Sequence, residues 1–479
     1  MTDRFTARRR TAALLVAAAL ALAGCTTTPT TPPTLDLPAG TPAANEVALD
    51  RWWTVFDDPV LTAYEDEALA HNLDLAAAMA RIETARAQVT LASSSLYPSV
   101  NLNTSASRNR ITEVGGNPLP FQTNSTSSDF RIALDASYEL DLWGKYRTAT
   151  KAAREDLLAS RYAREAVQTI VTAEVARAYF QLLATDAQLA LLNETLASRD
   201  QTVGLQRDRY QAGVIGEYDL ASTEAERAAV LGDIATTRRA AGELETALAT
   251  LLGRSPREVY APVLTHDAKT ARAIGVPSIP ADLPSNLLER RPDIRQVERQ
   301  LAAASLRIDV ARADYFPSLS LTGALGTESG LLKNLFSGPA LIWGIGGNLL
   351  QPIFGLKAIE ANVQATTARR EEVVVAYQQT VQSAFRDTRN ALVASEASRA
   401  ALAAQGLRRE RLARALELGD IRYRAGYSPL LEVLDLQRQL LQAQTLEIAA
   451  ARDARIAVVD LAKAMGGGWD YKDAVAAQR

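Results

Sequence analysis

The stretch Leu96-Tyr97-Pro98-Ser99-Val100-Asn101-Leu102 has a counterpart 219 residues later, Tyr315-Phe316-Pro317-Ser318-Leu319-Ser320-Leu321. In both copies a helical pattern ends at an aromatic residue and a proline, and an alternation of apolar and polar residues begins. The helical patterns that precede them open at Asp74-Leu75 and Asp293-Ile294, again 219 positions apart. The chain is therefore internally duplicated, which restricts the fold before any single element is considered.

Two later matches keep the same order. Trp143-Gly144 corresponds to Phe354-Gly355, and Arg209-Tyr210-Gln211-Ala212-Gly213 corresponds to Arg422-Tyr423-Arg424-Ala425-Gly426. Each half is predicted as a helix, two strands, a very long helix, a turn and a helix. The predicted ranges are a helix at 61–96, strands at 100–108 and 130–140 and a long helix at 145–210, then a helix at 286–315, strands at 319–325 and 341–351 and a long helix at 357–423.

The long helices exceed the size of an ordinary globular domain. The stretch 145–210 contains no proline and would span about 100 Å as a helix. Apolar residues recur in it every seven positions, at Val175, Leu182, Leu189, Leu196, Val203 and, as an aromatic, Tyr210. Such spacing predicts coiled-coil packing. A soluble coiled coil would satisfy the helices alone, so they do not decide the class of protein.

The strand segments favour a membrane barrel. Val100, Leu102, Thr104 and Ala106 alternate with polar residues, and Ile132 and Leu134 do so in the next strand. Apolar-out, polar-in alternation is typical of a barrel around a wet lumen, although a soluble sheet with one buried face alternates likewise. Backbone groups in lipid must all be paired, and four strands cannot close into a barrel. Several chains would therefore have to share one barrel.

The N-terminus has the composition of a targeting segment. Arginines at positions 4 and 8–10 precede a short apolar run that ends in Leu22-Ala23-Gly24-Cys25. These four residues resemble the bacterial lipobox, in which cleavage before the cysteine is followed by lipidation of its thiol. A plain secretory signal with a chance cysteine is the alternative, but Cys25 is the only cysteine of the chain. Thr26, which is not aspartate, favours outer-membrane sorting, and the Thr- and Pro-rich stretch 26–42 is predicted to be a tether.

The composition excludes several classes of function. The formal net charge of −3 offers no basic footprint for nucleic acid. One cysteine and two histidines rule out an intrachain disulfide framework and argue against a transition-metal site. We therefore expect no catalytic residues, no metal and no cofactor apart from covalent lipid (palmitate) on Cys25, and we predict a channel rather than an enzyme.

The predicted organisation follows the duplication. It comprises a signal peptide at 1–24, a lipid anchor and tether at 25–48, a first repeat at 49–252, a proline-rich linker at 253–284, a second repeat at 285–465 and a C-terminal tail at 466–479.

Several motifs resemble the TolC-like outer-membrane efflux factor family, in its lipoprotein branch. They are Trp52-Trp53-Thr54-Val55-Phe56-Asp57-Asp58-Pro59-Val60-Leu61, Arg290-Arg291-Pro292-Asp293-Ile294-Arg295 with Glu298-Arg299-Gln300-Leu301, and Phe316-Pro317 at a strand start. The resemblance covers nearly all of the chain after the signal. It implies a mainly α homotrimer with a twelve-stranded outer-membrane β-barrel and a long α-helical periplasmic barrel. It also implies passive conduction with a periplasmic adaptor and an inner-membrane efflux transporter as partners.

The resemblance also implies a periplasmic gate. The segment Gly426-Tyr427-Ser428-Pro429-Leu430-Leu431-Glu432-Val433-Leu434-Asp435 matches the tip of the family, where acidic residues narrow the pore. Glu432 and Asp435 are three positions apart and so share one helix face; an isolated pair of this kind is usually only a solvated face. Asp219 matches a gate-linking carboxylate of the family and Tyr423 a tyrosine of the same network. Ser428 replaces the family's arginine, so the latch is either missing or rebuilt from Arg422 or Arg424.

Two other functions fit parts of the pattern. A type I protein secretion duct would share the whole architecture, and a structural coiled-coil envelope lipoprotein would share the helices and the anchor but has no need of the alternating strands. The exported cargo and the identity of the partner pump are not encoded in these motifs.

Overall fold

The computed structural model of the protein describes residues 28, 30–33, 50–112, 125–277 and 290–468. The chain divides into two compact units: unit 1 holds residues 1–33, 84–159 and 298–376, and unit 2 holds residues 34–83, 160–297 and 377–479. Cys25 and the boundaries predicted at residues 24, 48 and 284 lie outside the described residues.

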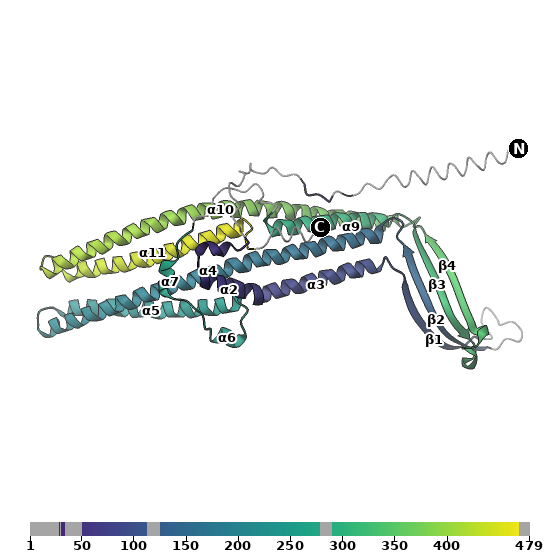
Figure 1. The fold of residues 1–479 in the computed structure, drawn as a ribbon, viewed down its shortest axis with the longest axis horizontal. Helices are drawn as coiled ribbons and strands as arrows, with labels where there is room; N and C mark the ends of the chain where they lie inside the picture. Colours follow the sequence, from purple (N-terminus) through teal and green to yellow (C-terminus); the bar gives the residue numbers. More distant parts are fainter. Residues whose placement is uncertain (1–27, 29, 34–49, 113–124, 278–289, 469–479) are drawn as a thin grey trace. The chain divides into compact units, whose positions relative to one another are not determined.

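Unit 1 contains a four-stranded antiparallel sheet. Its strands are β1 (Ser99–Arg110), β2 (Thr126–Leu140), β3 (Ser318–Ser329) and β4 (Leu341–Leu350), in the order β1-β2-β3-β4 (Figure 1). Two short 3-10 helices, η2 (Leu332–Asn334) and η3 (Gly338–Ala340), connect β3 to β4. All four predicted strands are present, and three of them are longer than predicted because the backbone pairing continues past the alternating residues.

The register of the sheet separates apolar from polar residues. One row across the four strands consists of Leu102, Leu134, Leu325 and Trp343, which are successive partners. The neighbouring row consists of Asn101, Asp135, Ala324 and Gly344. Because directly opposed residues point to the same side, the first row lies on one face of the sheet and the second on the other.

The apolar face of the sheet is uncovered. The exposed fractions are 66% for Leu102, 48% for Leu134, 55% for Leu325 and 73% for Trp343. A soluble sheet would bury such a row against a core, since contiguous exposed apolar patches of this kind mark interaction or membrane surfaces. The alternation fits either a soluble sheet with one buried face or a membrane barrel. The exposure of the apolar row favours the barrel, in which this face meets lipid.

Four helices contribute residues to both units: α3 (Leu73–Ser94), α4 (Lys145–Gln211), α9 (Pro292–Ala313) and α10 (Leu356–Arg424). The predicted helix at 61–96 is wrong as a single element, because it is divided into α2 (Pro59–His71) and α3. Asn72 causes the break: its side-chain Oδ1 accepts from the amides of Asp74 (2.9 Å) and Leu75 (3.2 Å) and caps α3. Among the described residues, no helix combines the length and the apolar composition needed to cross a membrane.

Unit 2 also contains η1 (Trp52–Phe56), α5 (Glu217–Leu251), α6 (Pro256–Tyr260), α7 (Ala268–Ala273) and α11 (Leu430–Ala464). Its main core joins the N-terminal aromatics Trp52 and Trp53 to α4 and to the end of α11. The predicted seam of α4 is confirmed where Val175 and Leu182 are fully buried. Further along, the seam packs on Val230 and Ile234 of α5.

The duplication is visible in the backbone. Left-handed glycines occur in pairs at corresponding positions, with φ values of 76° at Gly144 and 82° at Gly355, and 72° at Gly213 and 78° at Gly426. A third pair, which the sequence motifs did not reveal, ends α5 and α11 at Gly253 and Gly466. Glycine adopts this conformation without a Cβ penalty. The same residue therefore precedes the long helix in each repeat, and follows the end of each helix of the hairpin.

Glu65 on α2 is an acid inside the core of unit 2. Its exposed fraction is 0%, and neither carboxylate oxygen has a hydrogen-bond partner among the described residues. Burial, with a smaller contribution from Asp66, raises the pKa of Glu65 well above its usual value. The side chain is therefore accommodated as the neutral acid.

We expect Glu65→Gln to stabilise the fold at pH 8 by roughly 1 kcal/mol or more. The folded pKa lies above the unfolded one, so the stabilising contribution is complete below the unfolded pKa and is lost as the pH rises through the folded pKa. Thermal midpoints in detergent at pH 4.5 and pH 8 measure this, with Asp233→Asn, at an exposed acid of α5, as control. An unchanged pH slope in Glu65→Gln would show that Glu65 is not the titrating group.

Candidate functional site at the helix tips

Two helical hairpins of unit 2 end in equivalent turns. The first joins α4 to α5 and the second joins α10 to α11 (Figure 1). In the first turn the amide of Val214 donates to the carbonyl of Arg209 (2.9 Å), and in the second the amide of Tyr427 donates to the carbonyl of Arg422 (2.9 Å). In each turn, a left-handed glycine immediately precedes the residue whose amide donates. This arrangement is a Schellman cap. The tips are thus built the same way in both repeats.

Tyr423 links the two tips. Its hydroxyl oxygen, near the end of α10, accepts from Nη1 of Arg209 (3.0 Å) and from Nε2 of Gln206 (3.3 Å), both near the end of α4. The predicted gate tyrosine therefore bridges the hairpins. Its partner arginine comes from the first repeat rather than from Arg422 or Arg424.

Arg199 forms a second junction deeper in the helices. Its exposed fraction is 3%. Its Nη1 donates to Oε1 of Gln437 on α11, and its Nη2 lies 3.7 Å from Oε2 of Glu226 on α5. Burial lowers the pKa of Arg199 while Glu226 opposes that shift. One guanidinium thus connects α4, α5 and α11 just above the tips.

The two predicted gate acids differ in their surroundings. Glu432 is exposed in the first turn of α11, where the helix dipole favours a negative charge. Asp435, one turn further, accepts from Arg438 (2.5 Å) and Gln439 (2.6 Å) of its own helix. The charge of Asp435 is therefore partly compensated within the helix, whereas Glu432 presents its carboxylate to solvent.

Of the other residues predicted at the tips, Asp219 and Arg424 make separate contacts, each within its own helix. Asp219 lies in the first turn of α5, where its carbonyl accepts from the Thr223 hydroxyl (2.7 Å). Arg424 forms an ion pair with Asp420 of its own helix (2.8 Å). The buried Oγ of Ser428 has no hydrogen-bond partner among the described residues. At the tips, the two hairpins are joined by the hydrogen bonds that Arg209 and Gln206 donate to the hydroxyl of Tyr423.

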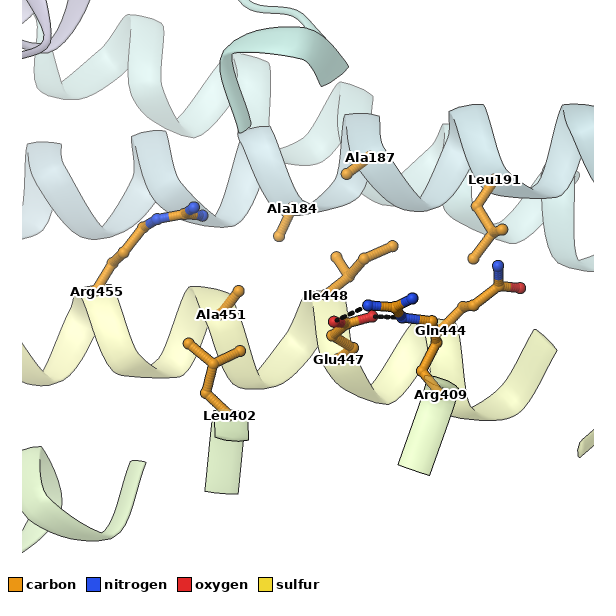
Figure 2. Close-up of a pocket in the computed structure, with 10 residues that line it drawn as sticks. All are labelled: Ala184, Ala187, Leu191, Leu402, Arg409, Gln444, Glu447, Ile448, Ala451 and Arg455. Carbon is orange, nitrogen blue, oxygen red and sulfur yellow. Dashed lines mark hydrogen bonds and ion pairs between the residues drawn. The ribbon is translucent and has the colours of Figure 1, made fainter. Parts of the chain in front are cut away.

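A cavity of about 510 Å³ lies between α4, α10 and α11 (Figure 2). Its charged side chains are engaged: Nε of Arg409 donates to Oε2 of Glu447 (3.0 Å), and Nη2 of buried Arg455 donates to the carbonyl of Ile274 (2.6 Å). The rest of the lining is mostly alanine, leucine and isoleucine. The bond from Arg409 joins α10 to α11, and the bond from Arg455 joins α11 to the residue that follows α7.

The comparisons with known proteins agree with this architecture. Residues 65–254 and 283–467 match the family described as Outer membrane efflux protein. The chain belongs to the outer membrane efflux protein family. The two matched ranges correspond to the two repeats, so both halves carry the family pattern.

Full-length members of the family resemble the chain. The pyoverdine export outer membrane protein OpmQ of Pseudomonas aeruginosa is 33% identical over 468 residues, which is 95% of this chain and 96% of OpmQ. The probable outer membrane lipoprotein SilC of Salmonella typhimurium is 29% identical, with 90% of each chain covered. The crystal structure of the Campylobacter jejuni CmeC outer membrane channel superposes with a TM-score of 0.85 at 29% identity, covering 94% of this chain and 98% of CmeC.

Membership confirms several predictions. The chain has the predicted fold, a mainly helical, internally duplicated protomer with the four strands of an outer-membrane channel. It is an outer-membrane exit channel for efflux. The family and the relatives are named as efflux or export proteins of the outer membrane.

Sequence reasoning missed Arg209, Gln206 and Arg199. The duplication carried a signal for Arg209, because it occupies the position in the first repeat that Arg422 occupies in the second. Its bond to Tyr423 joins two hairpins that the repeat pattern alone did not bring together. No comparable signal in the sequence distinguishes Gln206 or Arg199 from the many other polar residues of the helices.

Proposed function

We propose that three copies of the chain assemble into one outer-membrane duct, through which cargo passes to the exterior. The observation that carries the proposal is the uncovered apolar face, combined with outer edges of β1 and β4 that have no partner strand among the described residues. In lipid such edges must be paired. The number three comes from the family resemblance and gives a barrel of twelve strands.

The strand order suits closure between copies. Each described strand pairs antiparallel with its neighbour, so β1 and β4, at the two edges, run in opposite directions. The β4 of one copy can then pair with β1 of the next in the same antiparallel sense as the other strands. The polar row with Asn101 and Asp135 would face the lumen and the row with Leu102 and Trp343 the lipid.

The assembly would work with partners that supply the energy. A periplasmic adaptor and an inner-membrane efflux transporter are the partners expected from the family, and the duct conducts passively. Cys25, outside the described residues, would carry the lipid that adds a second membrane anchor; the name of SilC, an outer membrane lipoprotein, supports this.

The tips would form the periplasmic entrance. Three copies of Glu432 and Asp435 would line its narrowest point, with Asp219 on the adjoining hairpin. The bonds from Arg209 and Gln206 to Tyr423, and the Arg199 junction, would hold the two hairpins of a protomer together in the closed state. The closing latch is thus rebuilt from the first repeat.

We expect Tyr423→Phe to raise conductance in planar bilayers several-fold, since it removes only the hydroxyl that accepts the bonds from Arg209 and Gln206. Wild-type protein should form a pore with long closed periods. Tyr427→Phe is the matched control, because Tyr427 is largely exposed at the same tip. Absence of any pore in the wild type would overturn the channel, whereas equal conductance of Tyr423→Phe and wild type would overturn only the latch.

A further inference from the structure

The described part of the N-terminal tether contacts the body of unit 1 at Thr28. The backbone amide of Thr28 donates to both carboxylate oxygens of Asp309 on α9, at 3.2 Å each. Its hydroxyl donates to Oδ1 of the same carboxylate at 2.7 Å. Hydrogen bonds to an ionised acceptor are stronger than neutral ones, so one aspartate engages both polar donors of Thr28.

Arg312 completes the arrangement from the same face of α9. Its Nη1 donates to Oγ1 of Thr28 (3.1 Å) and lies 3.5 Å from Oδ1 of Asp309. The Thr28 hydroxyl is thus used both as donor and as acceptor. Thr28 is half-buried, while Thr30 and Thr31 of the same threonine-rich stretch are exposed. Among the described threonines of the tether, the contact therefore involves Thr28.

This contact lies beside the membrane end of unit 1. Arg312 is in the last turn of α9, and β3 begins six residues later at Ser318. Between them, the ring of Phe316 stacks on Trp143 with centroids 4.9 Å apart, and the indole of Trp143 donates to the carbonyl of Pro317 (2.7 Å). Aromatic rings at strand ends are typical of the membrane–water interface.

We propose that Asp309 and Arg312 form a docking site for Thr28 and thereby fix the place at which the lipid anchor enters the membrane. The inference rests on the proposed lipidation of Cys25. Thr28 is three positions after Cys25, a covalent reach of at most about 11 Å, whereas a chain free as far as Asp50 could reach about 85 Å. Docking thus confines the acyl chains to the lipid beside the barrel wall.

Amide hydrogen exchange of the full-length protein in detergent tests the docking site. We expect the Thr28 amide to exchange at least tenfold more slowly than those of Thr30 and Thr31. Asp309→Ala should remove that protection, and Thr28→Val should reduce it, because the hydroxyl bonds are lost. Thr31→Val, the same chemical change at an exposed position, should leave it intact.

The lipidation of Cys25 and the docking of Thr28 can each be contradicted without the other. In Cys25→Ser the incorporation of radioactive fatty acid should cease while the Thr28 amide stays protected, because the docking site needs no lipid. Persistent labelling of Cys25→Ser would overturn the lipid assignment alone. Fast exchange at Thr28 in the wild type, or protection that survives Asp309→Ala, would overturn the docking site.

Discussion

Neutralising the tip acids, as Glu432→Gln with Asp435→Asn, is expected to lower the cation preference of the open pore by about threefold or more, because rings of like charge concentrate counter-ions. The double variant should also relieve block by multivalent cations. The structure refines the expectation for single variants. Asp435 is bonded to Arg438 and Gln439, whereas Glu432 is exposed, so Glu432→Gln should account for most of the change.

Reversal potentials of single channels at low salt measure this effect, since screening shortens the reach of the charges to about 10 Å at 0.1 M. The matched control is Glu410→Gln, an exposed acid of α10 that lies 14 residues before the end of that helix. If the double variant keeps the wild-type selectivity and block, Glu432 and Asp435 belong to a solvated helix face and not to a gate.

The second large effect is expected at Gly326 in the centre of the sheet. A Cβ there would lie 2.2 Å from the carbonyl oxygen of Ile132 and 2.5 Å from Cα of Ala133, both backbone atoms of β2. Backbone cannot yield as a flexible side chain can, so Gly326→Ala should break the β2–β3 pairing at a cost of about 3 kcal/mol. A variant with this defect should fail to form a barrel.

Heat-modifiable migration on a gel reports barrel formation. We expect the wild type to migrate differently before and after boiling, and Gly326→Ala to lose the difference. Gly323→Ala on the same strand is the matched control, because the nearest atom to its added Cβ is 3.8 Å away, an ordinary van der Waals contact. A heat-modifiable Gly326→Ala would mean that the close approach of β2 and β3 is not required.

Local sequence patterns predicted the helices and strands whose periodicity directly reflects which residues share one face of the element. The heptads of α4 correspond to a helix that buries one face in the core of unit 2. The alternation in β1 corresponds to a strand whose successive side chains point to opposite faces, one apolar and one polar. The break at Asn72 escaped prediction, since an asparagine within a helical pattern can be either a cap or an exposed residue. The strands are longer than predicted because their ends pair with residues of neighbouring strands, which a local sequence pattern does not show.

The site was predictable only in part. The turns at Gly213 and Gly426 follow from local chemistry, and the family resemblance located Glu432 and Asp435. The bond between Arg209 and Tyr423 joins residues 214 positions apart, and that between Thr28 and Asp309 joins residues 281 apart. Contacts of that kind depend on how whole elements pack, which no window of sequence contains.

The central claim is that one chain supplies four strands to a barrel that other copies must complete. The mass of the protein purified in mild detergent, measured by light scattering with the detergent contribution removed, tests it most directly. The account predicts a monodisperse particle of three protein chains. A monodisperse monomer would contradict the shared barrel, and with it the ring of acids at the tip.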